Sequence, residues 1–430
     1  KKIEGLNQIL GSLRTEGDHP DVYVVNQNSF TGIGNNTFVY WFGQDVLSLF
    51  DKYNTLDQYV ETFSGIVTGD NDHHLRKFWE VTESNAESNY EPWVDNGRDT
   101  DYYDYTDTLV RWENNGENIK EYANKHGKNI QGFSELPEMF NPAVVFRDFS
   151  SDFTAKYLTE EAIHSKTAYK IDIQDDLIYY LLGYLNSDLN RYIMKGLNPG
   201  LHFNPGDVEN IPFDQSPDEL ENVEQWAKYC LEQRKQQAAI EDKSLEFDST
   251  VFRNNYDELC HYADMIDAKV ALASGVISEL VYADYGIDGA SRKQISEEGN
   301  AKLIEYPYVC KDTDAEIPDI FTDKVRRVVD SEYWSEIRRD VSGSSELDVI
   351  ELSHKLEVSP LTVAEIKKEI GQYSDDQAEK AAGSIVSVIF GSLFGYYDAS
   401  TPENDGILDI SEYADEYEKL FVTTAEELFQ

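Results

Sequence analysis

Residues 175–197, DDLIYYLLGYLNSDLNRYIMKGL, carry a clear helical pattern. Apolar residues recur there every three or four positions, which is the spacing of an amphipathic helix. The pattern breaks at Asn186-Ser187-Asp188, and this combination offers an N-cap for a second helix. The stretch therefore predicts two consecutive helices that bury an apolar face.

The residues before this helix pair are typical of a mixed structure with many short strands. Residues 21–30 and 35–43 are β-branched and aromatic runs broken by Asn and Gly, which predicts strands. Residues 43–63 have helical spacing and predict a helix followed by a shorter one. Between 65 and 213, strand-like pieces alternate with aromatic loops such as residues 99–112.

The residues after Pro212 are predominantly helical in pattern. Residues 216–247 predict a long connecting helix capped by Ser216 or Asp218. Further helices are predicted over 252–285 and 320–340, and residues 345–371 predict two helices joined by a turn at 357–360. The fold class predicted for the whole chain is α+β.

One uncharged stretch imitates a membrane span. Residues 381–397, AAGSIVSVIFGSLFGYY, run for 17 residues without a charge. They fall short of the roughly 20 residues that a spanning helix needs, and glycines and serines dilute them. We expect a buried core helix and no membrane association.

Cysteine usage and the first residues indicate a cytoplasmic fragment. Cys230, Cys260 and Cys310 lie far apart with no C-x-x-C pair, which fits reduced thiols and provides no zinc framework. No secretory signal opens the chain. It begins Lys-Lys without Met, so we expect a piece of a longer protein.

Charge is the strongest compositional signal. Asp and Glu number 82 against 37 Lys and Arg, a net charge of −45 with pI near 4.3. The carboxylates are spread along the chain, and repeated D-x-D-x-D-G calcium loops are absent. A DNA mimic would gather them on one face, which the sequence leaves open. We favour a halophilic protein, in which a hydrated acidic surface maintains solubility. Because the Debye length is only about 3 Å at 1 M salt, such a protein can still bind DNA through local contacts.

The segment GDNDHH, residues 69–74, raises the possibility of a metal site through Asp70, Asp72, His73 and His74. Adjacent histidines point in different directions on a helix or a strand, and no second ligand cluster is distinctive. We therefore expect no metal and treat His73 and His74 as incidental. A metal-dependent nuclease that uses Asp70, Asp72 and His73 remains an alternative.

A second candidate is the F-x-G-x-G pattern at residues 30–34, which is the S-adenosylmethionine signature of adenine-N6 methyltransferases. A strand-like run follows it where a helix is required. The partner motif Asn/Asp-Pro-Pro-Tyr/Phe, which holds the target base, is absent from the chain. No catalytic centre emerges from the motifs. Loops rich in Asn, Gly, Arg and aromatic residues remain; they suit phosphates and base edges, or simply turns.

Several segments, in chain order, resemble the target-recognition half of adenine-specific DNA methyltransferases of the Type IIG and PglX kind. GIVTGDNDHHLRKFWEV at 65–81 resembles the G-x-x-T-G-x-N-x-x-F/L-R block that opens this half. Residues 179–213 resemble the stretch Y-L-L-G-x-L-N-S…N-P-T-x-N-F-Q-x-G-D-I-x-N-I-P. Weaker likenesses keep the family order at residues 107–122, 146–158, 277–288 and 384–398.

This resemblance implies the recognition and C-terminal part of a PglX-like methyltransferase from a halophile, which marks host DNA in a BREX-type phage-defence or restriction-modification system. The cofactor S-adenosylmethionine and the catalytic motifs would belong to a methyltransferase domain before residue 1. No catalytic, cofactor or metal residue is therefore expected here, and the F-x-G-x-G pattern is set aside. The implied partners are double-stranded DNA, that N-terminal domain and other defence proteins.

The same resemblance divides the chain into a mixed α/β target-recognition domain over 1–215, a helical connector over 216–250 and a mainly helical C-terminal domain over 251–430. Arg76 and Lys77 are expected to contact phosphates, and Asn71 an adenine edge. The full set of expected DNA-binding residues is Thr68, Gly69, Asn71, Arg76, Lys77, Arg111, Lys156, Tyr157, Asn198 and Asn204.

Two observations keep other functions open. In FRDFSSDF (146–153) Asp replaces Lys of the family pattern, which puts phosphate contacts there in doubt. The helices at 345–371 resemble a helix–turn–helix, although two packed helices are usually part of a core. A protein-interaction scaffold of the defence complex without DNA contact is the alternative to a DNA-recognition module.

Overall fold

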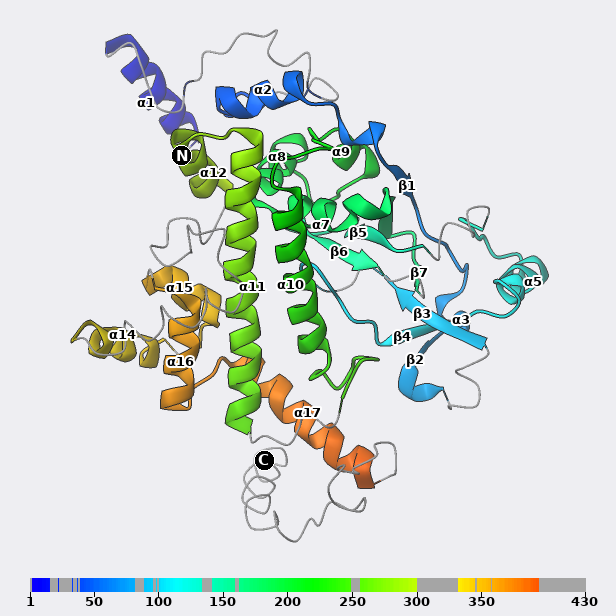
Figure 1. The fold of residues 1–430 in the computed structure, drawn as a ribbon. Coiled ribbons are helices and arrows are strands. Elements are labelled where there is room, and N and C mark those ends of the chain that lie inside the picture. Colours follow the sequence, from blue (N-terminus) through cyan, green and yellow to red (C-terminus); the bar gives the residue numbers. More distant parts are fainter. Residues whose placement is uncertain are drawn as a thin grey trace.

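The computed structural model describes residues 2–15, 22, 33, 37, 39–81, 89–95, 98, 100–133, 141–158, 162–248, 256–299, 332–344, 346–356 and 358–393. Figure 1 shows the arrangement of these parts. Two long helices, α10 (Leu220–Ala238) and α11 (Tyr256–Tyr285), run side by side through the molecule. Strands lie on one side of them, and shorter helices surround the pair.

The first sheet packs directly on the helical body. Its strand order is β1-β8-β5-β6, and all neighbours are antiparallel. The helix pair α7 and α8 lies beside this sheet, with α7 in contact with β5, β6 and α10. The bounds are β1 Glu61–Phe63, β5 Ala143–Arg147, β6 Ala155–Leu158, β8 Ala168–Asp172, α7 Ile178–Asn186 and α8 Asp188–Leu197.

The second sheet forms a separate small lobe that we define as residues 65–133 together with β7. Its strand order is β2-β4-β3-β7, antiparallel except for the β3–β7 pair. The lobe has its own apolar core around Trp93, Val110, Trp112 and Ile119. It projects away from the long helices, with α5 at its far end (Figure 1). The bounds are α3 Asn71–His74, β2 Leu75–Lys77, β3 Tyr90–Val94, β4 Thr108–Arg111, α5 Glu117–His126 and β7 Ile163–His164.

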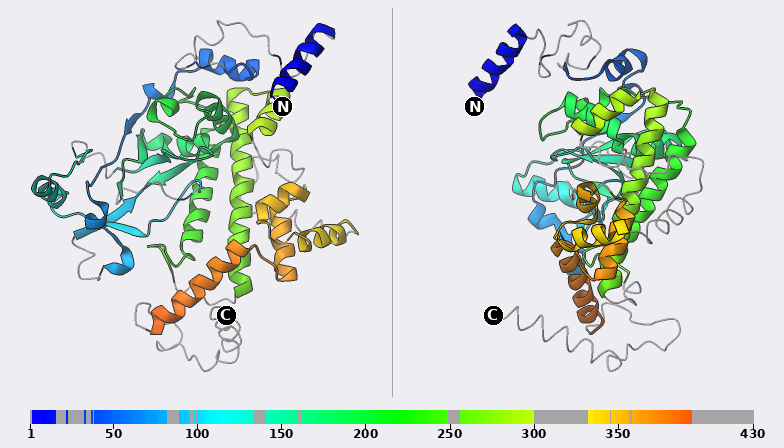
Figure 2. Two further views of the ribbon diagram at one scale, coloured as in Figure 1. Left: turned by 180° about the vertical axis from the view of Figure 1, so that it is seen from behind. Right: turned by 90° about the vertical axis from the view of Figure 1, so that its left-hand side faces the viewer.

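The remaining elements flank these layers. Helices α14, α15 and α16 pack together against α11 on the side away from the strands, as the two views in Figure 2 also show. The bounds are α1 Lys2–Thr15, α2 Gln44–Lys52, η3 Leu56–Gln58, η4 Phe78–Glu80, η5 Asp175–Leu177, α9 Pro205–Glu209, α12 Gly289–Gly299, α14 Glu332–Ser342, α15 Val349–Leu356, α16 Pro360–Ile370 and α17 Asp375–Leu393.

One continuous apolar core extends from Ile33 to Ile366 and includes the helix pair at residues 175–197. Gly183 of α7 permits a close approach to α10, because a Cβ at this position would lie 2.8 Å from a Val223 methyl group. The core crosses residue 215, the proposed end of the recognition domain. That division of the chain remains a proposal.

Most helices predicted from periodicity are confirmed. The break in the helix pair lies at Ser187, whose Oγ accepts the Asn190 N–H at 3.3 Å and caps α8. The helices expected over 43–63, 252–285 and 345–371 are present as α2 with η3, α11, and α15 with α16. For the helix expected over 320–340, the described residues begin at 332, where α14 starts. The α+β fold class is confirmed.

The strand predicted over 35–43 is wrong at its described residues. Residues 39–43 form a turn in which the Phe42 N–H donates to the Val39 carbonyl at 3.0 Å. Val39 and Phe42 are both buried, and the Phe42 ring lies over Gly196. A turn places these two side chains on the same side, which alternating strand geometry would not do. Of the strand predicted over 21–30, all but Val22 lies outside the described residues, as does the F-x-G-x-G pattern except Ile33.

The predicted cap of α10 is also wrong. The helix begins after Glu219, and no side-chain cap hydrogen bond is present. The Glu219 N–H donates instead to the Asp284 carboxylate of α11 at 3.0 Å. Packing against α11, rather than a local cap at Ser216 or Asp218, therefore determines where α10 starts.

The uncharged stretch 381–397 is helical as far as Leu393, where the described residues end. Of its side chains described, from 381 to 388, only Ala381 and Ser384 are buried, and Val386 is 38% exposed. The buried core helix predicted here is wrong, because α17 packs on one side alone, against α11 and the residues after α10. Among the described helices, none combines the length and apolar character that crossing a membrane requires.

Candidate nucleic-acid interface

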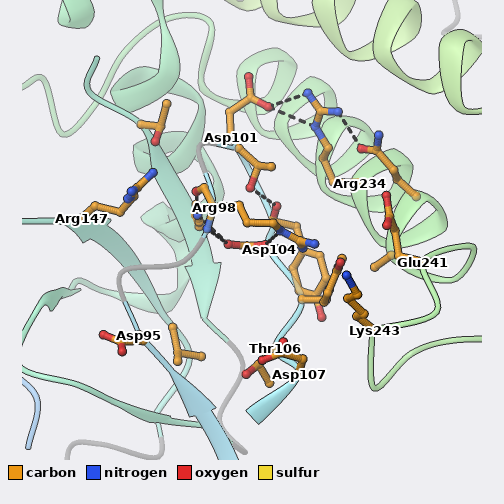
Figure 3. A pocket seen from close by; sticks show the side chains of 18 of the residues that line it. Asp95, Arg98, Asp101, Asp104, Thr106, Asp107, Arg147, Arg234, Glu241 and Lys243 are labelled. Atoms are coloured by element: carbon orange, nitrogen blue, oxygen red, sulfur yellow. Dashed lines mark hydrogen bonds and ion pairs between the residues drawn. The ribbon is translucent and has the colours of Figure 1, made fainter. Parts of the chain in front are cut away.

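A cleft of about 1150 Å³ separates the strands from the helices (Figure 3). One wall consists of β5, β6 and the loop that joins β3 to β4. The opposite wall comes from the C-terminal half of α10, the residues that follow it, and the start of α17. The cleft thus lies mainly between residues before 192 on one side and residues after 233 on the other.

The β3–β4 loop supplies more of the cleft lining than any other loop, and its central residues anchor it to the helices. The Asp101 carboxylate accepts from Arg234 of α10 at 2.9 Å, and the Tyr102 hydroxyl lies 3.0 Å from Ser274 Oγ of α11. Tyr102 is fully buried and adopts a φ of 61°, which is uncommon for a residue with a side chain. Its N–H and carbonyl pair with β6, so the loop joins the small lobe, the first sheet and the helices.

Asp101 is the centre of a half-buried ion-pair network at the inner end of the cleft. Arg234 bridges it to Asp267, at 2.9 Å and 2.6 Å, and Arg191 of α8 lies 3.6 Å away. Burial raises the pKa of the Asp101 carboxyl, but the guanidinium groups of Arg234 and Arg191 outweigh this effect and hold the pKa below its usual value. The Asp101 carboxylate is therefore charged at neutral pH, and the network joins the β3–β4 loop to α8, α10 and α11.

Lys156 of β6 lies in the same wall and is buried rather than available to a ligand. Its Nζ donates to the Asp104 carboxylate at 2.8 Å and to the Arg98 carbonyl at 2.5 Å. Asp104 also accepts from the Arg98 guanidinium (Figure 3). That guanidinium stacks on the Tyr105 ring at 3.1 Å. Burial lowers the pKa of the Lys156 ammonium, and the nearby Asp104 carboxylate partly offsets this effect.

Tyr157, the next residue of β6, is half-buried at the edge of the cleft. Its ring stacks on Tyr179 with centroids 5.5 Å apart and planes 8° from parallel. Lys228 of α10 lies 4.5 Å above the Tyr179 ring. Lys156 and Tyr157 thus line the same cleft, and the Lys156 ammonium and the Tyr157 ring both have partners within the protein.

The cleft as a whole is acidic. Its lining holds eleven carboxylates against seven Lys and Arg side chains. A surface that takes DNA phosphates along its length normally has the opposite balance. The carboxylates are Asp95, Asp101, Asp104, Asp107, Asp152, Glu241, Asp242, Asp267, Asp348, Asp376 and Glu379, and the cations are Arg98, Arg147, Lys156, Arg191, Arg234, Lys243 and Lys380.

Six of the ten expected residues, Thr68, Gly69, Asn71, Arg76, Lys77 and Arg111, lie together in the small lobe. Thr68 is buried and its hydroxyl donates to the Asn71 side-chain oxygen at 2.5 Å. Gly69 has a φ of +78°, which a residue with a side chain would rarely adopt. The turn leaves Asn71 exposed at the start of α3, with its amide nitrogen available to a ligand.

The three basic residues of this group already interact within the protein. The Arg76 guanidinium donates to the carbonyls of Asp72 and Leu75, at 2.8 and 2.6 Å. Lys77 pairs with Asp107 at 2.6 Å, and Arg111 pairs with Glu113 at 2.6 Å. The ion pairs of Lys77 and Arg111 are partly exposed, and exchange of such partners for phosphate costs little.

Asn198 and Asn204 lie elsewhere, in the turn between α8 and α9, and neither lines the cleft. The Asn198 amide donates to the His202 carbonyl at 2.5 Å and to Asp207 at 2.6 Å. Asn204 forms a capping box with Asp207 at the start of α9. The structure gives both residues a role in closing this turn, and their DNA contact remains a prediction.

The histidines that the sequence analysis treats as incidental belong to a cluster of rings. His73 of α3 stacks on Tyr122 of α5 with centroids 3.9 Å apart and planes 13° from parallel, and His126 lies 4.4 Å from the same ring. The spacing of Tyr122 and His126 on one helix is visible in the sequence. Their contact with His73 is not, because it joins segments almost 50 residues apart.

Asp70 fixes this cluster in place. Its carboxylate pairs with Lys128 at 2.8 Å, accepts from the Tyr122 hydroxyl at 3.2 Å and caps α3. The hydrogen bond from Lys128 lowers the pKa of Asp70. His74 is buried below, without partners for either ring nitrogen, and burial lowers its pKa to about 4. Within the described parts of the chain, no group of three or more His, Cys, Asp or Glu side chains has the geometry to hold a metal ion.

Comparison with known proteins adds a sequence relationship. The chain is 24% identical, over 221 residues, to the adenine-specific methyltransferase PglX of Lacticaseibacillus casei (strain Zhang). This chain is similar to PglX. The match covers 47% of the chain and 18% of the PglX sequence, so the chain corresponds to a small part of that relative. No family model matches it.

The chain is also similar to a solved structure. It is the Type IIL restriction-modification enzyme MmeI in complex with DNA, with 14% sequence identity and a TM-score of 0.35. The match covers 56% of this chain and 35% of that one. The sequence similarity to PglX supports the predicted resemblance to adenine-specific methyltransferases at the level of a distant relative.

Proposed function

We propose that this chain is the DNA-recognition and C-terminal part of an adenine-N6 DNA methyltransferase that marks host DNA in a phage-defence or restriction-modification system. The observation that carries the proposal is the sequence similarity to PglX. S-adenosylmethionine and the catalytic motifs then belong to a methyltransferase region outside this chain. Its own contribution is to hold double-stranded DNA in register with that region.

The geometry is compatible with such a role. The small lobe projects away from the long helices (Figure 1). The cleft lies between the strands and the helices (Figure 3). Asn71 offers an exposed amide at a rigid turn, which is a suitable group for an adenine edge. Lys77 and Arg111 lie on neighbouring strands of the lobe sheet, where their exposed ends can donate hydrogen bonds to phosphate oxygens.

The acidic balance of the cleft favours a second candidate function. A cleft with more carboxylates than cations suits a basic protein surface better than a nucleic acid. The chain would then be a scaffold that holds a partner of the defence complex. This alternative predicts that the chain alone does not bind DNA, and that any binding by its fusion to the methyltransferase region is unaffected by substitutions in the lobe.

A binding assay separates the two functions. The chain, alone and joined to its methyltransferase region, is mixed with methylated and unmethylated host duplex in concentrated potassium chloride, and the complex is followed by gel shift. We expect both proteins to bind the duplex. Asn71→Ala should reduce the preference for one DNA sequence, and Lys77→Gln should weaken the binding of all sequences to the same extent. If neither the chain alone nor its fusion binds the duplex, the DNA-recognition function is excluded and the scaffold function remains.

A cleavage assay in the presence and absence of EDTA tests the nuclease alternative through Asp70, Asp72 and His73. Asp70 already pairs with Lys128, and His73 stacks on Tyr122, so both side chains have structural roles. We expect no EDTA-sensitive cutting of the duplex. Cutting that EDTA abolishes would overturn this expectation.

A further inference from the structure

The segments that carry α3, β2 and α5 are less acidic than the chain as a whole. Residues 70–77 and 117–128 hold five Lys and Arg against four Asp and Glu, and three histidines as well. The whole chain holds 37 against 82. In a protein of net charge −45, a local excess of cations is where a polyanion meets the least repulsion.

Exposed rings accompany these cations. His73 and His126 are exposed, and Tyr122 lies half-buried in contact with both rings. Lys125 is exposed three residues after Tyr122, which places it on the same side of α5. Lys128 follows the end of the helix. We name this set of five residues, His73, Tyr122, Lys125, His126 and Lys128, the ring-and-lysine surface.

The surface is held in one conformation before any ligand arrives. Asp70 accepts from Tyr122 and from Lys128, and its backbone begins α3. The stack joins α3 to α5, and Gly127 ends α5 in a left-handed conformation. A surface whose side chains are already ordered loses little conformational entropy on binding.

We propose that the ring-and-lysine surface binds the sugar–phosphate backbone of duplex DNA outside the cleft. Ammonium and imidazole N–H groups donate to phosphate oxygens, and the rings contact the deoxyribose between them. The proposal rests on the proposed DNA-recognition function and adds to it a contact away from the acidic cleft. It also explains how so acidic a chain retains a duplex, because the phosphates meet a surface on segments in which cations slightly outnumber carboxylates.

The test uses Lys125→Gln and a double variant, Lys125→Gln with His126→Gln, in the whole chain. The matched control is Lys368→Gln, because Lys368 is also exposed in the last turn of a helix, α16, on the other side of the long helices. All three variants remove a positive charge from the C-terminal end of a helix. An effect of this loss on helix stability should therefore be present in the control as well. Thermal melting followed by circular dichroism verifies that each variant is folded.

Binding of a labelled host duplex is measured by fluorescence anisotropy over a range of potassium chloride concentrations. We expect the double variant to bind about fivefold more weakly, and each lost phosphate contact to shift the slope of log K against log salt by about one unit toward positive values. Lys125→Gln alone gives part of this shift, and Lys368→Gln gives none. A single strand of the same sequence, with its different backbone geometry, shows a smaller difference between variants.

Two negative outcomes are distinguishable. If the unaltered chain and its fusion to the methyltransferase region both fail to bind duplex, the proposed function fails. If the unaltered chain binds duplex while the double variant binds with the same affinity and salt slope as Lys368→Gln, the DNA contact at this surface is overturned and the proposed function stands.

Discussion

Asp104 and Asp107 belong to the same loop, and each pairs with a lysine, but the two pairs differ in burial. The Asp104 and Lys156 side chains are 8% and 6% exposed, whereas those of Asp107 and Lys77 are 29% and 42% exposed. Removal of one partner from a buried pair leaves an uncompensated charge and costs about 3–5 kcal/mol. An exposed pair contributes roughly 1 kcal/mol or less.

We therefore expect Asp104→Ala to lower the free energy of unfolding by about 3–5 kcal/mol and Asp107→Ala by about 1 kcal/mol or less. Denaturant unfolding in concentrated potassium chloride measures both. If the two variants lost the same free energy of unfolding, water would have to reach Lys156, and the Asp104–Lys156 pair would not be buried in the cleft wall.

His74 predicts a pH dependence of stability. Burial lowers its pKa to about 4 in the folded protein, against about 6.5 when unfolded. Between these values the unfolded chain binds the additional proton, so stability falls as the pH falls, at most by about 1.4 kcal/mol per pH unit. We expect His74→Leu to remove this contribution, so that the variant gains stability relative to the parent between pH 6.5 and 4.

Denaturant unfolding of the parent and of His74→Leu at a series of pH values tests this expectation, because the difference between them cancels the carboxylates they share. A constant difference over this range would show that His74 becomes protonated while folded. His164, buried on β7 with a pKa of about 4, stays in both proteins and provides the common background.

At the scale of elements, Asn186 joins the end of α7 to β6. Its amide accepts the Ala155 N–H at 3.0 Å and donates to the Ala155 carbonyl at 2.9 Å, and all these groups are buried. Asn118 makes the same kind of bridge in the lobe, from Glu113 N–H to the Arg111 carbonyl, but at the surface. Water can replace the second bridge but not the first.

We expect Asn186→Leu to lower the free energy of unfolding by about 1–3 kcal/mol, since the Ala155 N–H loses its partner in the core. Asn118→Leu should cost less than about 1 kcal/mol. Thermal and denaturant unfolding of the two variants measure this contrast. A loss for Asn118→Leu as large as that for Asn186→Leu would contradict the role of burial.

How far the sequence predicts this molecule depends on whether a signal is local. The helix pair at 175–197 is predictable because periodicity and the Ser187 cap act within a few residues. The start of α10 is not, because Asp284, 65 residues away, provides its hydrogen bond. The β3–β4 loop is the largest omission: its acidic and aromatic residues signal a loop, but their partners on α10 and α11 exist only in the folded chain.

The candidate site shows the same limit. Thr68, Gly69 and Asn71 form the tight turn that their residue types favour, so this part was accessible to sequence. Lys156 and Asn198 carry hydrogen-bonding groups that suit DNA, but the Lys156 ammonium is bonded to Asp104, 52 residues away, and the Asn198 amide to Asp207 of the next helix. A residue type indicates which bonds a side chain can make, and the tertiary fold decides whether a ligand or the protein makes them.

For the whole molecule, the net charge of −45 governs the response to salt. Carboxylates outnumber cations in the chain and in the cleft, so at low ionic strength they repel one another and repel DNA. Added salt shortens the Debye length from about 10 Å at 0.1 M to about 3 Å at 1 M and removes most of this repulsion. Stability and duplex affinity should therefore respond in the same direction over this range.

We expect the melting temperature to rise steeply up to about 1 M potassium chloride and then to level off, because further screening has little left to remove. We expect duplex affinity to rise over the same range, whereas a protein bound mainly through counterion release loses affinity with every increase in salt. Calorimetry and anisotropy on one sample series measure both quantities. A control series with sucrose, which strengthens burial without screening charge, should raise the melting temperature while leaving duplex affinity at its low-salt value. If duplex affinity instead falls steadily as salt is added from low concentration, counterion release at phosphate contacts outweighs the screening of carboxylate repulsion, and the expectation is contradicted.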